Sequence, residues 1–387
     1  MNLQPVFSTH QFKVEVLTPT HVGMAQEKHY QRGLDFIVDK KTIYFLKQAE
    51  VLRQLKPQDL TDFSTWLATN NVRRIEQFIV QNKLNFTKYL HRYEAAFDEN
   101  VQEIRRQYAD GMGQFFIPGS SIKGAIRSIF YEALKQRHGA QADEGRLFGN
   151  ITNNLMQGLQ VGDLPIPVGQ IKVYRIKVFS ADRKPEAGEG TWKDRSRQGH
   201  MANFNPTQFV THYESVKSGT TSELRIARLK SDNGNPVLVG KQRHLQNADW
   251  LQQQDLVSLI RSHTRRYLEK EKVYYQAYAN KDLEAVKSMQ ERLNNLLARN
   301  EEPNACLLRV GANVGYHSIT GDWKYPDHVS AWIDSDGQEW LNGRRVERHR
   351  HLSNQIKAKT RKFVFLKQAD ETFSFLPMGY LKLTLLP

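Results

Sequence analysis

The chain has 387 residues, 39% of them hydrophobic, and its 55 Lys and Arg against 41 Asp and Glu give a formal net charge of +14. Its single cysteine, Cys306, excludes an internal disulfide framework, and the sequence shows neither a signal peptide nor an apolar run of the roughly 18 residues that span a bilayer. We therefore expect a cytoplasmic protein of two or three domains that binds a polyanion and no membrane.

The first part of the chain predicts strands and then helices. Residues 11–18 alternate apolar and polar side chains as a half-buried strand does, and residues 34–47 predict two strands joined by a tight turn at Asp39 and Lys40. The pattern from about residue 48 to residue 110 is helical and charged, and Gly111 and Gly113 end it. Residues 114–119 predict another strand, after which a helix opens.

The rest of the chain mixes both kinds of element. Residues 159–179 alternate again, residues 180–206 form a loop rich in Gly, Pro and charge, and residues 208–229 predict a hairpin around Lys217–Gly219. Residues 250–300 predict two helices broken near residues 279–281, and residues 362–366 and 380–386 predict strands. Strands from both ends with helices between them indicate an α+β fold.

The helix that opens after Pro118 ("PGSSIKGAIRS") has an unusual start. Its apolar stripe, from Ile122 to Leu134, is typical of a core-facing helix. A helix start offers unpaired N–H groups to an anion, and here it is joined by serines that can cap, glycines that permit close approach and two cations four residues apart. These parts suit a phosphodiester backbone, although an ordinary capped helix explains them equally well. The residues concerned are Gly119, Ser120, Ser121, Lys123, Gly124 and Arg127.

Two enzyme motifs are excluded at this helix. A nucleotide-binding P-loop needs adjacent Gly and Lys, but Lys123 follows Ile122. The Ser-x-x-Lys pattern of penicillin-binding enzymes begins at Ser120, and Lys217–Gly219 and Ser231–Asn233 resemble that family's other two elements. Their order along the chain is reversed, however, which argues against an acyl-enzyme.

A second candidate site is the glycine-rich stretch at 309–321 ("RVGANVGYHSITG"). Gly311 and Gly315 free the backbone, while Arg309, Tyr316 and His317 offer a cation, a stacking face and a donor, as in sites for single-stranded RNA. A tight turn between strands is the alternative. His21 and Gly23, just after the first strand, are candidates to join this surface.

The basic run at 344–362 predicts either a solvated face or a surface that meets phosphates. His349 and His351 lie within it, but no signature of a metal site accompanies them, and we expect neither a metal nor another cofactor. The sequence offers no compelling catalytic centre. The cations of this run are Arg344, Arg345, Arg348, Arg350, Lys357, Lys359, Arg361 and Lys362.

The segment "FFIPGSSIKGAIRS" (115–128) resembles the most recognisable segment of the RAMP superfamily of CRISPR RNA-binding proteins. Other pieces match in the same order, including "LFG" (147–149), "LQVGD" (159–163), "YESVKSGT" (213–220) and the glycine-rich stretch. Two more pieces match, "VLTPTHVG" (16–23) and "GLDFIVDKKTIYFLKQAEVLRQL" (33–55). These two pieces and the length of the chain are most similar to the family of fifth Csm subunits of type III-A effector complexes.

This resemblance implies an RRM-like (ferredoxin-type) core with helical insertions, although the RNP1 signature of RRM domains is absent. It implies a subunit that grips the 3′ part of the guide RNA (crRNA), stacks on the last repeated backbone subunit and caps the filament, in support of crRNA maturation and antiviral interference. Its partners would be guide RNA, target RNA and other Csm-type RAMP subunits. Residues 180–206 would form the thumb that wedges into the guide–target duplex.

The same resemblance suggests site residues and domain bounds. Guide phosphates would be held by Ser120, Ser121, Lys123 and Arg127, next to Gly119, with His21 and the Gly311–His317 loop beside them. We assign residues 1–50 and 111–180 to the RNA-binding core, 51–110 and 250–305 to helical insertions, 181–249 to the thumb-like loop and hairpin, and 306–387 to the glycine-rich loop and the strands that complete the core.

One departure argues against target cleavage. The repeated subunit that cuts target RNA carries an acidic residue directly after a His-Ile-Gly-Gly stretch, whereas this chain has "HVGMAQEKH" (21–29), with Glu27 but no Gly-Gly-x-Asp, and Asp35 further on. We expect a non-catalytic subunit. Two alternatives stay open: an endoribonuclease that processes guide RNA, using His21 or His317 as a base or Asp35 or Glu27 as a metal ligand, and a backbone subunit of another CRISPR class.

Overall fold

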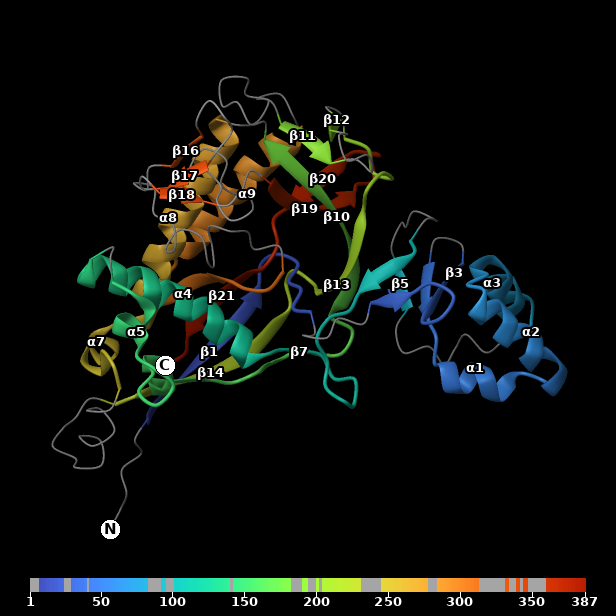
Figure 1. Ribbon diagram of the computed structural model, residues 1–387, viewed down its shortest axis with the longest axis horizontal. Coiled ribbons are helices and arrows are strands. Elements are labelled where there is room, and N and C mark those ends of the chain that lie inside the picture. Colours follow the sequence, from blue (N-terminus) through green and yellow to red (C-terminus); the bar gives the residue numbers. More distant parts are fainter. Residues whose placement is uncertain are drawn as a thin grey trace, which may run out of the picture.

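The computed structural model shows an α+β protein and describes residues 7–23, 29–39, 42–82, 92–94, 101–139, 142–181, 190–193, 200–201, 204–230, 245–277, 284–312, 331–333, 339–341, 344–346 and 360–387. Two sheets carry helices packed against them, and a smaller helical unit stands to one side (Figure 1). No helix in the described ranges is both long and apolar enough to cross a membrane.

The first sheet consists of β15 (Ala305–Arg309), β21 (Tyr380–Leu385), β1 (Phe7–Val16), β14 (Thr221–Leu229) and β8 (Leu159–Val161), side by side in this order. Every neighbouring pair is antiparallel. The chain passes from β1 to β8 through helix α4 (Gly119–His138), and helix α8 (Leu256–Ala277) follows β14. A β-α-β-β-α-β order with these pairings is the ferredoxin-type arrangement, so the predicted fold class is confirmed.

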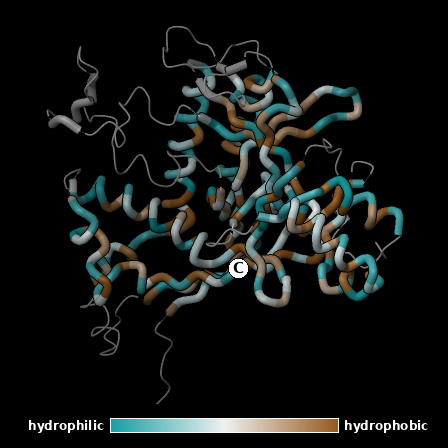
Figure 2. The backbone as a smooth tube through the Cα atoms, turned by 45° about the vertical axis from the view of Figure 1, so that its right-hand side comes forward, coloured by the Kyte–Doolittle hydropathy of each residue, from teal (hydrophilic) through white to brown (hydrophobic). Residues whose placement is uncertain are grey.

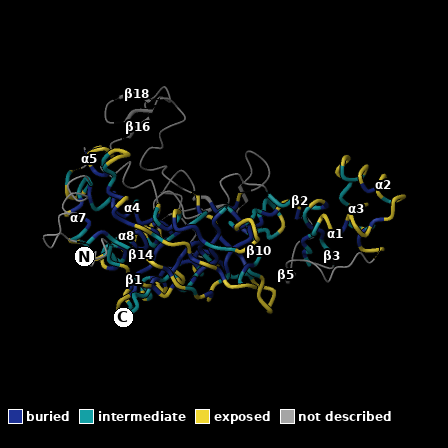
Figure 3. The backbone as a smooth tube through the Cα atoms, turned by 90° about the horizontal axis from the view of Figure 1, so that it is seen from below, coloured by how far each residue is buried: buried dark blue, intermediate teal, exposed yellow. Residues whose placement is uncertain are grey.

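A continuous core lies between this sheet and helices α4 and α8. Phe12, Val14 and Val16 of β1 are buried while the residues between them face outward, which confirms the predicted alternation. The apolar stripe of α4 is also buried, with Ile122 and Ile126 both 0% exposed. Hydrophilic and hydrophobic residues are interspersed along the backbone (Figure 2), and the buried residues gather in the centre of the molecule (Figure 3).

The second sheet consists of β12 (His200–Met201), β11 (Gly190–Lys193), β10 (Ile171–Ala181), β13 (Thr211–Val216), β6 (Glu103–Arg105) and β2 (Tyr30–Gln31), in this order. Strand β19 (Thr360–Lys367) pairs with β10 and with β20 (Phe373–Leu376). One face packs on α8 and on α9 (Glu284–Asn300) through an aromatic cluster that includes Trp192 and Phe363.

The two strands and the turn predicted at residues 208–229 are present as β13 (Thr211–Val216) and β14 (Thr221–Leu229), but these strands do not pair with each other as a hairpin; they join the two sheets. Strand β13 lies in the second sheet, whereas β14 pairs along its length with β1 in the first. The sequence-based division placed residues 181–249 outside the core, but β14 is a central core strand. Leu224 and Ile226 of β14 face the core and are 1% and 0% exposed. Their place in the core becomes apparent only from the pairing of β14 with β1.

The segment expected to be helical from residue 48 to residue 110 is helical only in its first part. Helices α1 (Gln48–Gln54), α2 (Pro57–Ala68) and α3 (Val72–Gln81) stand beside a small sheet of β3 (Phe36–Asp39), β4 (Thr42–Phe45) and β5 (Arg92–Glu94). The prediction is wrong for residues 92–94 and 103–105, which are strands. The spacing of Val101 and Ile104 fits a helix, but pairing of β6 with β13 and β2 keeps this backbone extended.

The two helices predicted for residues 250–300 are present as α8 and α9, and the predicted break lies outside the described residues. The remaining elements are short. They are β7 (Phe116–Ile117), α5 (Glu144–Phe148), the 3-10 helix η2 (Leu155–Gly158), β9 (Leu164–Pro165), α7 (Ala248–Gln253), β16 (Ala331–Ile333), β17 (Glu339–Leu341) and β18 (Arg344–Val346).

A buried ion pair connects α8 to β19. The Arg361 guanidinium donates two hydrogen bonds of 2.7 Å to the two carboxylate oxygens of Glu271, and it lies 3.9 Å from the centre of the Tyr274 ring. Glu271 and Arg361 are only 4% and 8% exposed. Arg361, one of the cations in the basic run, is therefore part of the interior.

Replacing Arg361 by Met leaves the Glu271 carboxylate buried without its cation, and we expect the free energy of unfolding to fall by about 3–5 kcal/mol. The double variant Arg361→Met/Glu271→Leu removes both charges and should recover most of the loss. Urea unfolding measures all three proteins. A double variant no more stable than the single one would contradict this explanation.

Candidate nucleic-acid interface

The first turn of α4 is capped by a carboxylate from another segment. The Gly119 N–H donates to Asp163 Oδ1 at 2.7 Å, from the turn between β8 and β9. Pro118 is the N-cap residue and its carbonyl accepts from the Ser121 N–H at 2.9 Å, so both serines lie inside the helix. The expectation that a serine caps α4 is wrong, and the exposed Ser120 points its short polar side chain away from the core.

The two glycines of this turn have different roles. A Cβ on Gly119 would lie 2.3 Å from the Val161 carbonyl oxygen and 2.6 Å from that of Gly162, so only glycine fits against the β8 end. A Cβ on Gly124 would meet nothing within 4 Å. The close approach expected at these glycines is therefore between Gly119 and the backbone of residues 161–162 of the same chain. At Gly124 the surface of the helix is open.

Lys123 and Arg127 are on one side of α4, as their spacing predicts, but they differ in charge balance. Arg127 pairs with Glu144 of α5 and lies 4.4 Å from the centre of the Phe148 ring. Lys123 makes no ion pair with any residue that the structure describes, and partial burial lowers its pKa. The uncompensated charge at this site is Lys123, because Arg127 is held by α5.

A small cavity connects α4 to the second candidate segment. Its lining comes from three elements that are far apart in the sequence, so the buried side of α4, helix α8 and the start of the glycine-rich stretch meet around it. The lining residues are Ala125 and Ile129 of α4, His263, Thr264 and Tyr267 of α8, and Leu308 and Arg309 of β15.

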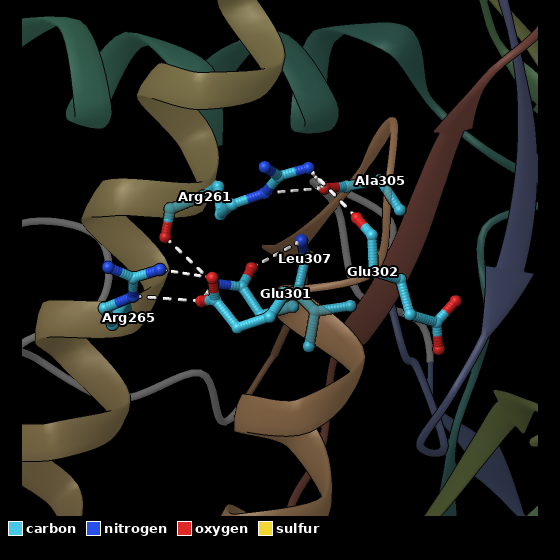
Figure 4. Close-up of polar contacts among 7 residues, drawn as sticks. Arg261, Arg265, Glu301, Glu302, Ala305 and Leu307 are labelled. Atoms are coloured by element: carbon cyan, nitrogen blue, oxygen red, sulfur yellow. Dashed lines mark hydrogen bonds and ion pairs between the residues drawn. The ribbon is translucent and has the colours of Figure 1, made fainter.

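Strand β15 is held by α8 at the position this meeting requires. The Arg261 guanidinium donates to the Ala305 carbonyl at 2.6 and 3.0 Å and to the Glu302 carbonyl at 3.0 Å, while Arg265 pairs with Glu301 (Figure 4). The Asn300 side chain bonds both the Arg261 carbonyl and the Leu307 N–H. These bonds fix where the glycine-rich stretch begins.

The Arg309 side chain makes its contacts within the protein. Its guanidinium donates to the Tyr267 hydroxyl and, at 3.1 Å, to the Met378 carbonyl, and it lies 4.8 Å from the centre of the Tyr380 ring. The sequence analysis named this side chain as a candidate cation for RNA binding, whereas the structure shows it joining α8 to β15 and β21.

Gly311 and His21 are neighbours, as the sequence analysis grouped them. Gly311 has φ of +93°, and a Cβ there would lie 2.2 Å from the His21 carbonyl oxygen, which accepts the Ala312 N–H at 2.7 Å. The contact is between backbones. Gly315, Tyr316 and His317 lie outside the described residues.

The His21 ring is inside the protein. It is 1% exposed, its Nδ1 is 2.5 Å from the Glu214 carbonyl oxygen, and its ring centre is 4.8 Å from that of Tyr213. A direct RNA contact from this ring does not fit its burial, so its part in the site is to position the loop after β1.

Sequence reasoning missed Gln107 and Glu214, both 0% exposed. The Gln107 N–H donates to Glu214 Oε2 at 3.0 Å, its Oε1 accepts the Val22 N–H at 3.0 Å, and its Nε2 donates to the Phe116 carbonyl at 3.5 Å. The network thus reaches the strand that leads into α4. No sequence pattern separates this glutamine from surface polar residues.

Other predicted features lie partly outside the described residues. This holds for Glu27, for His349 and His351, and for most of the 180–206 loop, of which β11 and β12 are described as strands of the second sheet. The Asp35 carboxylate accepts the Gln31 N–H at 2.8 Å within a turn. In the basic run, Lys362 is exposed on β19.

Comparison with known proteins agrees with this fold. The model of the RAMP superfamily matches residues 13–363. A protein of Streptococcus thermophilus described as CRISPR system Cms protein Csm5 is 31% identical over an alignment of 137 residues that covers 30% of this chain and 37% of that protein. The chain therefore spans little more than a third of the length of this relative.

Solved structures are similar over nearly the whole chain. A chain of the cryo-EM structure of a Csm–crRNA–target RNA ternary complex, from a type III-A CRISPR-Cas system, matches with a TM-score of 0.60 at 16% identity and covers 97% of this chain and 100% of that one. The crystal structure of T. onnurineus Csm5 matches with a TM-score of 0.45 at 15% identity and covers 95% and 99%.

Two glycine variants in the first turns of α4 should change stability in opposite directions. Gly119→Ala forces a Cβ into the backbone of β8 and should lower the free energy of unfolding by about 1–3 kcal/mol. Gly124→Ala adds a helix-favouring residue in open space and should raise it by about 0.5–1 kcal/mol. Thermal and urea unfolding measure both, and equal effects would contradict the different surroundings described for the two positions.

Proposed function

The chain belongs to the RAMP superfamily, and from this premise we propose that it is a non-catalytic subunit of a type III-A (Csm) CRISPR ribonucleoprotein. It binds the 3′ part of the guide RNA and caps the filament of repeated backbone subunits. Its partners are guide RNA, target RNA and the other Csm-type RAMP subunits. The relatives support this, since one is described as Csm5 and the other comes from a complex with crRNA and target RNA.

The observation that carries the proposal is the uncompensated Lys123 in the first turns of α4. It lies beside the exposed Ser120 and Gly124, where a ligand can approach. The formal net charge of +14 attracts polyanions over longer distances. A lysine and hydroxyl at a helix start suit a phosphate group.

Lys123→Ala should weaken binding of single-stranded guide RNA and reduce the slope of log K against log salt by about 0.7, as expected for one lost phosphate contact. Arg137→Ala, at the other end of α4, is the matched control and should leave the slope unchanged. Fluorescence anisotropy from 50 to 200 mM salt measures both. If Lys123→Ala kept the wild-type slope, the assignment of the phosphate seat would be wrong.

Capping and polymerisation predict different stoichiometries. A capping subunit adds once to each assembly on the cognate guide, while a backbone subunit adds along its length. Sizing the purified chain with guide RNAs of two lengths distinguishes them, because only a backbone subunit gives a complex whose mass grows with the guide. Such growth would favour a backbone role over a cap.

We also propose that this chain does not cleave RNA. Among the candidate groups, the His21 ring is covered by Tyr213 and Glu214, and the Asp35 carboxylate is used within its own turn. Labelled repeat RNA should stay intact with the purified chain, with or without Mg²⁺. Cleavage that persisted in a His21→Ala/Asp35→Asn variant would point to another centre, and cleavage abolished by it would establish the endoribonuclease alternative.

A further inference from the structure

The two faces of the second sheet differ in what covers them. One face, with Phe179, Trp192 and Phe363, packs under α8 and α9. On the other face Val178 pairs directly with Lys362, so both point the same way. Phe179 pairs with Trp192, and since successive side chains alternate, Lys193 also turns to the face of Val178. Two lysines from separate strands therefore flank Val178.

Two further cations lie on this face nearer the other end of β10. The Lys172 ammonium is 5.8 Å from the centre of the Tyr174 ring, and the Arg105 guanidinium is 5.0 Å from that of Tyr213. Tyr174 pairs with Tyr213, which in turn pairs with Arg105. Residues 172, 174 and 178 share one side of β10, so the cations lie in two groups spread over about 20 Å along this strand. The buried Ile176 and Val364 lie between the two groups.

The lysines of this face are not balanced by acidic partners. Lys172, Lys193 and Lys362 form no ion pair with any described residue, and Lys193 and Lys362 are exposed. Partial burial of its ammonium group, and then the charges of Arg105 and Lys193, lower the pKa of Lys362. On the described strands of this face the acidic side chain is Glu103, which already contacts His29 and Gln31.

This face offers more charge than stacking surface. Tyr174 and Tyr213 are 7% and 1% exposed, so their rings are not available to bases, and the half-buried Phe209 ring lies 4.9 Å from the Lys193 ammonium. A ligand would therefore meet mainly cations, which fits the phosphates of a nucleic acid backbone and carries no sequence preference. We propose that Lys172, Lys193 and Lys362, beside Arg105, form a second, sequence-independent contact surface for the RNA backbone.

The surface is connected to the seat at α4. Gln107, two residues after Arg105, bonds the Phe116 carbonyl in the strand that leads into α4. The segments that carry Arg105 and the start of α4 are thus tied together in the interior, and we propose that one strand of RNA contacts both. The inference rests on the proposed function in this respect, because it extends the path of the same RNA.

The test compares two triple variants of the full-length chain that keep side-chain length. The variant Lys172→Gln/Lys193→Gln/Lys362→Gln removes the proposed contacts, and Lys13→Gln/Lys56→Gln/Lys272→Gln removes three charges elsewhere, on β1, before α2 and on α8. Anisotropy titrations from 50 to 200 mM salt use two single-stranded RNAs of unrelated sequence. Thermal unfolding by circular dichroism confirms that both variants fold.

We expect the first variant to lose about 2 from the salt slope, three contacts at about 0.7 each, equally for both RNAs, while the control keeps the wild-type slope. An unchanged slope in the first variant, with Lys123→Ala still reducing it, would overturn this surface and leave the proposed function intact. An equal loss in the control, or a loss for one RNA sequence alone, would also overturn it. A wild-type chain that binds neither RNA would overturn both proposals.

Discussion

The buried carboxylate of Glu214 holds together the segments on which the proposed RNA surface depends. It accepts the backbone N–H of Gln107, and the Glu214 carbonyl contacts the His21 ring. Gln107 then bonds Val22 after β1 and Phe116 before α4. A buried carboxylate or amide that loses its hydrogen bonds is costly in a medium of low polarity. These segments therefore keep one mutual arrangement, and the start of α4 is placed beside the second sheet.

The basic residues divide into arginines held by other groups of the chain and lysines without acidic partners. Arg309 and Arg361 bind a hydroxyl, carbonyl groups or a carboxylate and lie against aromatic rings in the interior, whereas Arg127 pairs with the exposed Glu144 at the surface. Lys123, Lys193 and Lys362 have no acidic partner among the described residues. A net charge of +14 thus predicts attraction to a polyanion. The side chains proposed to contact that polyanion are mostly lysines on α4 and the second sheet.

Sequence patterns predicted the fold well where local and tertiary preferences agree. The alternation in β1 and the apolar stripe of α4 are both core-facing, and the motif that grouped His21 with Gly311 corresponds to a real contact. Prediction failed where a distant strand decides the conformation. Residues 103–105 have helical spacing but are a strand because β13 and β2 lie on either side, and β14 looks like an accessory hairpin until its pairing with β1 is seen.

The amino-acid sequence alone determined the α+β class, the positive charge, most helices and strands, and the motifs that resemble the RAMP superfamily, because these depend on periodicity, composition and local order. Only the tertiary structure decided which candidate residues are exposed and without an acidic partner among the described residues. It buried His21, paired Arg127 with Glu144, bound Arg309 to Tyr267 in the interior, capped α4 with Asp163 in place of a serine, and gathered lysines from separate strands on one face. The physical reason is that burial and charge compensation depend on neighbours in space, which the order of residues along a chain does not specify.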